Sequence, residues 1–517
     1  MLNGPIDSVL LHGRVITPEG PSQALAISGD RIAAVGSDEQ IQALTTERIE
    51  QFDLQGRTVL PGFIDSHTHL VSTGLIETIY LSLTGARSLA EALESVRETY
   101  RAGERALGAG EWLLGWGWEE SRWPERRYLT RRDLDQVAPD RPVALFRVDG
   151  HLLVLNSKAL ELIDLPEEFA GRADLDRGLL WEEAAWWFHE QLEPSPEELE
   201  RALEAAIKKA HSLGVTSVHD IVRPSYIRAY QRLRAAGRLN LRIYLNPRAR
   251  AGDVEQLFAT GLRTGFGDEW LRLGGVKIFA DGSIGAGNAA LSESYLDREG
   301  RGRLNYSDEE LCRIVQEAHK QGWQVLIHAI GDRAIKQVLK IYELVGVSPS
   351  DRYRIEHLEL ASVEQLEQAA RMGLVASMQP NFLNWAKPGD LYEIRLGRNR
   401  TEQINPFRLA LDAGLRLALG SDCMPLGPLF GIHQAVNAPH PSQHLTVEEA
   451  IHGYTLGGAY ASFEEGLKGS IEPGKLADLV VLSEDPFEHP EAIEEIEVEL
   501  TFVGGELVFR RSGSERR

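Results

Sequence analysis

Short apolar runs alternate with longer stretches of helical spacing through the middle of the chain. Near-continuous apolar runs are typical of strands in a parallel sheet that is covered on both faces, and their alternation with helices indicates β–α units. Eight units fit a closed (β/α)₈ barrel of the α/β class, with a doubly wound open sheet as the alternative. The eight runs span residues 59–69, 215–220, 241–246, 274–281, 324–330, 354–360, 374–380 and 416–422.

Both ends of the chain follow a different pattern, in which apolar and polar residues alternate between turn residues. The first sixty residues show it, and so do residues 477–487 and 498–510. Alternation with a period of two is typical of half-buried strands. We therefore predict a small composite β-sandwich domain formed by residues 1–60 and 466–517, with the barrel in residues 61–465 between them.

The gap between the first two apolar runs, from residue 69 to residue 215, is too long for one β–α connection. We therefore predict an insertion subdomain over residues 75–205. Its tryptophans are expected either to fill the core of the insertion or, in part, to form an apolar roof over a site. Seven of the ten tryptophans lie in it: Trp112, Trp116, Trp118, Trp123, Trp181, Trp186 and Trp187.

The composition is that of an acidic globular protein. Apolar residues make up 43% of the chain and charged residues 26%, with 55 basic and 77 acidic side chains and a formal net charge of −22. This balance argues against a nucleic-acid partner or an anionic membrane surface, so we expect a small-molecule substrate. Two distant cysteines, no leader sequence and no membrane-spanning apolar window favour the cytoplasm. A homodimer is expected from base rates alone.

Histidines and an aspartate lie at the ends of several predicted strands. In FIDSHTHL, His67 and His69 are two positions apart, so both side chains point to the same face and can chelate one cation. His328 and His357 each lie late in a strand, and Asp422 ends the last one. Singly, each has a structural interpretation, such as a core histidine or a helix cap. Together they indicate a metal site at one end of the barrel.

A lysine interrupts the fourth apolar run, GGVKIFAD. Burying a charged amine is costly, so Lys277 is expected either to pair with a buried carboxylate such as Asp281 or to be modified. Reaction with carbon dioxide would turn its amine into a carbamate with two oxygens. Such an anion could bridge two neighbouring cations and offset their repulsion.

Taken together, these motifs resemble those of the amidohydrolase superfamily. The chain is most similar to the metal-dependent branch (amidohydrolase family 3) that includes N-substituted formamide deformylase and exoenzyme-regulatory proteins, and the resemblance covers nearly the whole chain. The matching segments are VLPGFIDSHTHL, GVKIFADGS, IHAIGD, IEH, GSD and GSIEPGKLADLVVLSEDP, with GWGWEE and DGHLLVLNSKAL in the insertion.

The resemblance implies a binuclear metal site and an amide-cleaving activity. A hydroxide bridging two divalent ions would attack a linear N-formyl or N-acyl amide, with Asp422 as general base and then general acid. Zinc is the default expectation, although manganese, iron or cobalt would suit similar ligands. The resemblance implies these ligands: His67, His69 and Asp422 for one ion, His328 and His357 for the other, and Lys277, as N6-carboxylysine, for both.

Two residues of the predicted insertion are candidates for binding the substrate. His151, in RVDGHLLVLN, could reach the substrate carbonyl, and Trp118, in GWGWEE, could contact the acyl or amine group. Each also has a structural interpretation, as a hydrogen-bonded or core-filling residue.

Three other functions stay open. A mononuclear aminohydrolase that deaminates a heterocycle would need one ion and no lysine on the fourth strand, so Lys277 argues against it. An ester or lactone hydrolase would use the same nucleophile, and the sequence does not separate it from an amidase. A non-catalytic relative would be expected to have lost ligands, whereas all six are present here.

Overall fold

The computed structural model describes residues 4–45, 49–103, 106–107, 112–148, 150, 152–181, 183–249 and 254–512. The chain divides into two compact units. The main unit consists of Met1–His69 and Ile207–Arg517, and the insertion unit consists of Leu70–Ala206. Among the helices described, none has both the length and the apolar character that a membrane crossing requires.

Each of the eight apolar runs contains a strand of the main unit, as predicted. These strands pair in parallel within two sheets, in the orders β18-β17-β16-β8 and β19-β20-β21-β22-β23. The short strand β18 (Leu271–Leu273) was not predicted. The eight strands are β8 (Phe63–Thr68), β16 (Val215–Val222), β17 (Arg242–Pro247), β19 (Val276–Phe279), β20 (Val325–Ala329), β21 (Arg354–His357), β22 (Val375–Met378) and β23 (Arg416–Leu419).

Backbone hydrogen bonds join the two parallel sheets at two places. The N–H of Ala249, after β17, donates to the carbonyl of Lys277 in β19 at 3.0 Å. On the other side, the N–H of Asp422, after β23, donates to the carbonyl of His67 in β8 at 2.9 Å. The fold is thus mixed α/β, and the carboxyl ends of its parallel strands face the same way.

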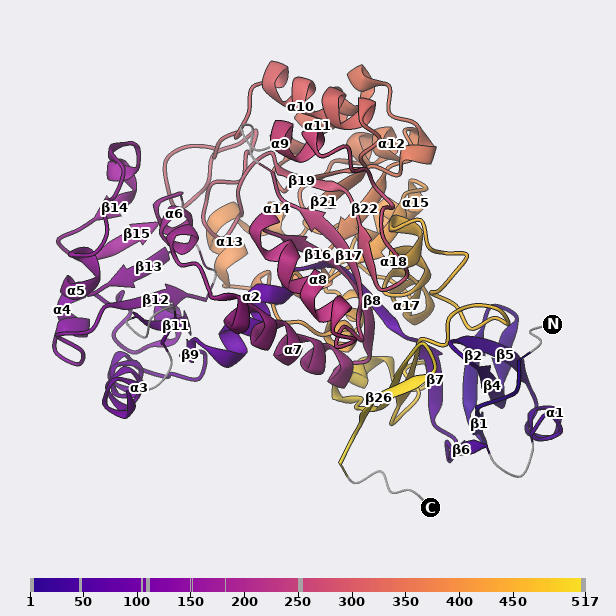
Figure 1. Cartoon of the computed structure of the whole chain (residues 1–517). Helices are drawn as coiled ribbons and strands as arrows, with labels where there is room; N and C mark the ends of the chain where they lie inside the picture. The colour runs from indigo at the N-terminus through magenta and orange to yellow at the C-terminus, as the bar shows by residue number, and fades with distance from the viewer. Residues whose placement is uncertain are drawn as a thin grey trace. The chain divides into compact units, whose positions relative to one another are not determined.

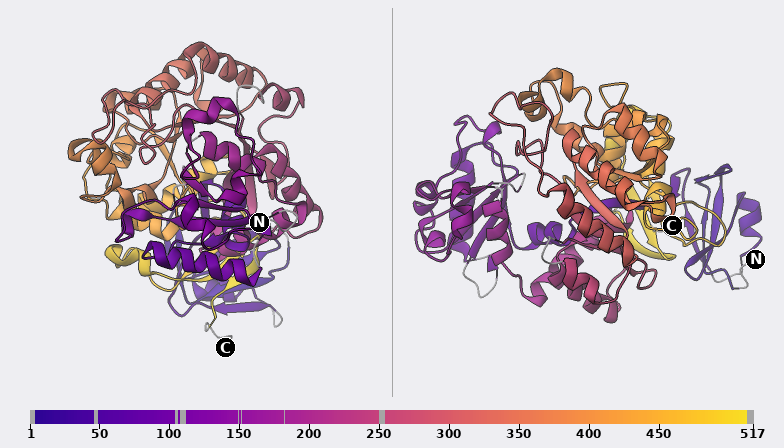
Figure 2. Two further views of the ribbon diagram at one scale, coloured as in Figure 1. Left: turned by 90° about the vertical axis from the view of Figure 1, so that its left-hand side faces the viewer. Right: turned by 90° about the horizontal axis from the view of Figure 1, so that it is seen from above.

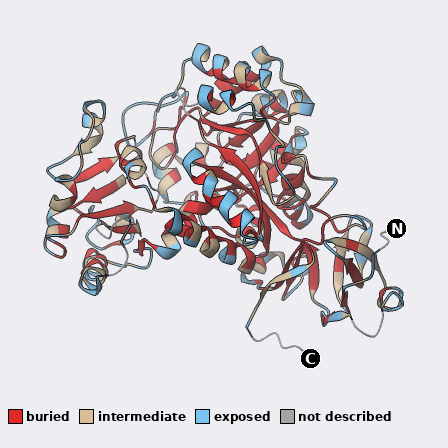
Figure 3. Cartoon of the chain, in the orientation of Figure 1, coloured by how far each residue is buried: buried red, intermediate tan, exposed pale blue. Residues whose placement is uncertain are grey.

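Amphipathic helices follow most of these strands. Helix α10, for example, begins with a capping box in which Ser307 and Glu310 bond each other's backbone N–H groups, an arrangement that satisfies free donors of the first turn. Figure 3 shows strands that are almost wholly buried and helices whose outer faces are exposed. The helices from Pro196 onward are α7 (Pro196–Ser212), α8 (Ile227–Ala235), α9 (Val254–Ala259), α10 (Asp308–Lys320), α11 (Asp332–Val345), α12 (Val363–Arg371), α13 (Leu391–Leu396), α14 (Arg398–Thr401), α15 (Phe407–Asp412), α16 (Pro428–Val436), α17 (Val447–Gly453) and α18 (Leu456–Ala461).

Strands from both ends of the chain form the β-rich part of the main unit. The two sheets have the orders β5-β4-β1-β6 and β26-β25-β24-β7-β2-β3, and Figures 1 and 2 show the indigo and yellow segments together. One core joins them, with the rings of Phe52 and Phe502 in contact at 5.1 Å. The elements are β1 (Ser8–Leu11), β2 (Arg14–Thr17), β3 (Gly20–Ser22), β4 (Ala24–Ser28), β5 (Arg31–Gly36), α1 (Asp38–Gln42), β6 (Glu50–Asp53), β7 (Thr58–Pro61), β24 (Leu479–Leu482), β25 (Val498–Val503) and β26 (Glu506–Arg510).

The insertion unit has a sheet and a core of its own. Its strands follow the order β10-β11-β12-β13-β15-β14, with β9 beside β11. Its elements are α2 (Leu70–Thr78), β9 (Leu81–Ser82), α3 (Leu89–Ala102), β10 (Ala106–Leu107), β11 (Trp112–Trp118), α4 (Arg131–Asp135), β12 (Val143–Arg147), β13 (Leu152–Leu155), α5 (Ser157–Leu160), β14 (Ala173–Asp174), β15 (Leu179–Trp181) and α6 (Glu183–Gln191).

Trp118 lies in this core and is 0% exposed. Its indole N–H donates to the carbonyl of Leu145 at 2.9 Å, and its ring lies 6.0 Å from that of Trp123. Both the apolar surface and the polar group of the side chain are therefore satisfied within the insertion unit. This burial favours the core-filling interpretation of Trp118 over contact with a substrate.

Trp118→Ala is therefore expected to destabilise the insertion unit by about 3–5 kcal/mol, the usual cost of removing a large buried ring. Thermal unfolding followed by tryptophan fluorescence would measure the loss, with the half-buried Trp112→Ala as the milder comparison. Preference between aliphatic and aromatic substrates should be unchanged in the folded variant. A clear shift of that preference would instead assign Trp118 to the substrate site.

Candidate metal centre

Three of the predicted ligands come together at the carboxyl ends of the parallel strands. One ligand atom each from His67 of β8, His357 of β21 and Asp422 after β23 lies within 4.8 Å of the other two. These three are the one such group among the described residues. Because they come from three separate strands, the arrangement depends on the tertiary fold and not on a local motif.

His69 and His328 adjoin this group from two sides. His69 Nε2 lies 3.0 Å from Asp422 Oδ1, and His67 Nε2 lies 3.7 Å from the same oxygen. The ring of His328 contacts that of His357, with centroids 4.4 Å apart. The imidazole of His357 in turn lies 4.8 Å from that of His67. All four predicted histidines and Asp422 thus form one continuous cluster.

Lys277 lies inside the same cluster and is 0% exposed. Its Nζ is 3.3 Å from His67 Nε2 and 4.6 Å from the centre of the Phe279 ring. Burial lowers the pKa of Lys277 to about 8, against the opposing influence of Glu356 and Asp422. The side chain therefore points at the predicted metal ligands, and its neutral amine is more accessible than that of a surface lysine.

Asp281, the alternative partner for Lys277, binds backbone N–H groups instead. Its carboxylate accepts the backbone N–H groups of Ala290, Ile330 and Gly331 at 2.9–3.1 Å. In the described part of the chain no ion pair joins Asp281 to Lys277. Asp281 instead ties the loop after β19 to the end of β20, the strand that carries His328.

Hydrogen bonds determine which nitrogen two of the histidines present to the cluster. His67 Nδ1 lies 2.5 Å from a carboxylate oxygen of Glu356, and His357 Nδ1 lies 2.6 Å from the amide oxygen of Gln379. Because these oxygens accept, each Nδ1 carries the proton and each Nε2 keeps its lone pair. An unprotonated ring nitrogen is what a metal ion requires.

His328 presents its other nitrogen. Its Nε2 lies 3.1 Å from the carbonyl of Gly282, which can only accept a hydrogen bond. In that tautomer Nε2 carries the proton, and Nδ1 keeps the lone pair that can bind a cation. His328 therefore differs from His67 and His357 in the atom that it offers to a cation.

The electrostatics of the cluster suit a divalent cation. Burial lowers the pKa values of His67, His328 and His357 well below the ordinary value, so these rings are neutral at neutral pH. Burial alone would raise the pKa of Asp422, but His67, His69 and Lys277 outweigh it and lower the pKa to about 2. Neutral imidazoles beside an ionised carboxylate form the donor set that zinc-like ions bind.

The backbone is strained at two of the predicted ligand positions. His357 has a φ of 72° and Asp422 a φ of 53°, in the left-handed region that residues other than glycine seldom adopt. Such conformations cost about 1–3 kcal/mol each and are found preferentially at functional sites. Here they turn each chain sharply after its strand, at the residue that offers a ligand atom.

Several supporting residues were not predicted from the sequence. Asp65 is buried and accepts the backbone N–H groups of His67 at 3.2 Å and Ser421 at 2.9 Å, which ties β8 to the turn that carries Asp422. Arg354 and Glu356 lie within β21, directly before His357. The available signal was a charged side chain inside an apolar run, in FIDSH and RIEH, the same signal that pointed to Lys277.

The geometry of this cluster does not test the two predicted substrate-binding residues. His151 lies outside the described residues, so its role stays a prediction. Trp118 is enclosed in the core of the insertion unit.

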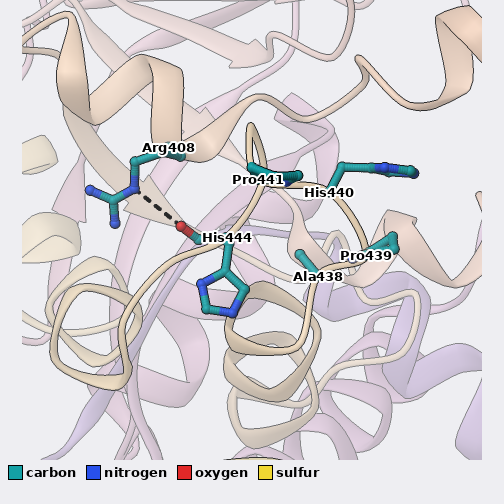
Figure 4. A pocket seen from close by; sticks show the side chains of 6 residues that line it. All are labelled: Arg408, Ala438, Pro439, His440, Pro441 and His444. Atoms are coloured by element: carbon teal, nitrogen blue, oxygen red, sulfur yellow. Dashed lines mark hydrogen bonds between the residues drawn. The ribbon is translucent and has the colours of Figure 1, made fainter.

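A separate surface pocket offers no comparable ligand set. In it, Arg408 donates to the carbonyl of His444 at 3.1 Å and pairs with Glu449. Figure 4 shows the imidazoles of His440 and His444 pointing apart. The pocket is lined by Arg408, Ala438, Pro439, His440, Pro441 and His444.

Comparison with known proteins gives matches over almost the whole chain. The profile of the Amidohydrolase family matches residues 50–509. The chain is 32% identical to YtcJ of Bacillus subtilis (strain 168), over 95% of this chain and 96% of that protein. It is 30% identical to N-substituted formamide deformylase of Arthrobacter pascens, over 98% and 99% respectively. The crystal structure of an uncharacterised metal-dependent hydrolase from Pyrococcus horikoshii OT3 has a TM-score of 0.78 and 29% identity, and covers 93% of this chain and 98% of that one.

Proposed function

This chain belongs to the amidohydrolase family, and from that premise we propose that it is a metal-dependent hydrolase of linear, non-peptide carbon–nitrogen bonds. The observation that carries the proposal is the convergence of His67, His357 and Asp422, with ligand atoms within 4.8 Å of one another. The 30% identity to an N-substituted formamide deformylase favours an N-formyl or N-acyl amide over an ester. The substrate is a small molecule in this proposal.

We infer that the eight parallel strands close into a (β/α)₈ barrel. The inference is supported by the backbone hydrogen bonds that join β17 to β19 and β23 to β8. In such a barrel the carboxyl ends of the strands form the active site. This is the end at which the ligand cluster lies.

We propose that the cluster holds two divalent ions, with zinc as the expected metal. When bound, such ions supply Lewis acidity toward the amide carbonyl. The closeness of His67, His357 and Asp422 supports two adjacent ions, but it would also suit a single ion, as in a mononuclear deaminase. The proposed ligands are His67, His69 and Asp422 for one ion, His328 and His357 for the other, and carboxylated Lys277 between them.

Asp422 is assigned the proton transfers. Its carboxylate is ionised at neutral pH, since its pKa lies near 2, and it can accept a proton from the attacking water. It then returns that proton to the leaving nitrogen, which makes a poor leaving group neutral. His69, 3.0 Å from Asp422 Oδ1, orients the carboxylate.

Lys277 is assigned as N6-carboxylysine. Its buried amine, with a pKa of about 8, has a larger neutral fraction than an exposed lysine. The neutral nitrogen attacks carbon dioxide, a C–N bond forms, and one amine proton leaves to a base. The product is an anion that offers two oxygens to cations and removes the positive charge next to His67.

The test is a hydrolysis screen over N-formyl, N-acyl and cyclic amides, with esters and aminated heterocycles as comparisons and metal content measured on the same sample. We expect about two metal ions per chain and release of an acid and an amine from linear amides. One tightly bound ion with release of ammonia from a heterocycle would favour the deaminase instead. The homodimeric state stays a prediction from base rates, and the cytoplasmic location stays a prediction from the sequence.

A further inference from the structure

Arg354 is a fully buried cation within the parallel sheet. It lies in β21, three residues before His357, and is 0% exposed. Burying a guanidinium is costly unless hydrogen bonds and a counter-charge compensate it. The groups that it binds therefore indicate its role.

Arg354 binds groups in its own strand and in three other strands. Within β21 its Nε and Nη2 donate to the two carboxylate oxygens of Glu356, at 2.6 and 3.0 Å. Nη2 also donates to the carbonyl of Ser66 in β8 at 2.6 Å and to the hydroxyl of Ser377 in β22 at 2.9 Å. Nη1 lies 2.9 Å from His219 Nδ1 in β16. The planar fork thus holds Glu356 in one orientation.

Glu356 in turn orients a proposed metal ligand, His67. The oxygen that accepts from Arg354 Nη2, Oε2, is also 2.5 Å from His67 Nδ1. An ionised carboxylate only accepts hydrogen bonds, so His67 must carry its proton on Nδ1 and keep Nε2 free.

We propose that Arg354 is a positioning residue that, through Glu356, holds His67 in the tautomer and ring orientation that offer Nε2 to the metal ion. The proposal rests on the proposed function, because the orientation of His67 matters to affinity only if His67 is a ligand. It extends the site to a residue that touches neither the metal ligands' donor atoms nor the reacting groups.

The test measures metal affinity and does not depend on a known substrate. Arg354→Lys keeps the charge but loses the fork that holds both oxygens of Glu356. Arg242→Lys is the matched control, because Arg242 is also buried and binds both oxygens of a carboxylate, that of Asp478, at 2.7 and 3.0 Å. Zn²⁺ affinity of the metal-stripped proteins would be determined by competition with a chromophoric chelator. The absorption spectrum of the Co²⁺-loaded proteins would report the coordination.

We expect Arg354→Lys to weaken Zn²⁺ binding by about 10–100-fold, the usual effect of removing support from a ligating histidine. Its Co²⁺ spectrum should also change, whereas Arg242→Lys should leave affinity and spectrum near those of the parent protein. Parent-like affinity in Arg354→Lys, or an equal loss in Arg242→Lys, would overturn the proposal. An equal loss in Arg242→Lys would mean that disrupting any buried arginine–carboxylate pair weakens Zn²⁺ binding by destabilising the protein as a whole.

Glu356→Gln keeps the proposal testable if Arg354→Lys does not fold. Glutamine has one accepting oxygen and one amide nitrogen, so it cannot accept hydrogen bonds at both positions of the carboxylate. Its amide nitrogen would face either Arg354 Nε or the position that Arg354 Nη2 and His67 Nδ1 share. Zn²⁺ affinity should again fall, and an unchanged affinity would overturn the proposal. A parent protein that binds no Zn²⁺ would refute the proposed function and this inference together. A parent that binds Zn²⁺ as tightly as Arg354→Lys would refute only the inference.

Discussion

Asp422→Asn is expected to lower kcat/KM by about 10²–10⁴-fold on the amide that the screen identifies, the range associated with loss of a general acid–base group. Asparagine has nearly the same shape, but its amide cannot take a proton from water or give one to the leaving nitrogen. The carboxylate of Asp422 faces His69 and His67 at 3.0 and 3.7 Å. No other residue is assigned both proton transfers.

Metal content has to be measured on the same samples, because Asp422 is also a proposed ligand. The matched control is Asp478→Asn, which removes a buried carboxylate that pairs with Arg242. That control should lose stability and keep its kinetic constants. An Asp422→Asn protein with full metal content and parent-like kcat/KM would show that another group moves the proton.

The strands of the main unit could be predicted because each is buried on both faces and therefore reads as an apolar run. The strand with which each of them pairs could not be predicted. The run 59–69 divides at Gly62 into β7, which pairs with β24 of the β-rich part, and β8, which pairs with β16. Nothing in the local sequence indicates this change of partner, since the decisive contacts are made with residues far along the chain. Strand β18 was missed because three residues are too short to show a period.

The residues of the cluster were predictable for a related reason, since each lies in, ends or closely follows an apolar strand. The groups that hydrogen-bond to these residues could not be predicted. His67 and Glu356 are 289 positions apart in the sequence, and only the tertiary fold brings them together. The same holds for the group His67, His357 and Asp422, which combines residues expected on different ions. Charged residues inside apolar runs marked where such groups lie, but not what they bind.

Lys277→Arg and Lys277→Glu are expected to differ in metal binding and activity, although both remove the lysine. Arginine cannot be carboxylated and keeps a positive charge close to His67 Nε2, where the lysine nitrogen lies at 3.3 Å. We expect it to lose a metal ion and to lower activity by about 10³-fold, which corresponds to several kcal/mol of lost transition-state stabilisation. Glutamate supplies a carboxylate, although on a shorter stem, and should keep part of the metal binding.

The same pair of variants tests whether Lys277 acts as an unmodified cation. If its ammonium served only to balance Glu356 and Asp422, whose charges favour its protonated form, arginine would preserve both stability and metal content. Glutamate would then place a third carboxylate close to those of Glu356 and Asp422 and destabilise the protein by charge repulsion. Mass spectrometry of the intact parent protein under native conditions adds an independent measurement, because carboxylation adds the mass of one carbon dioxide. A parent without that added mass, together with an active Lys277→Arg variant, would contradict the carboxylated state.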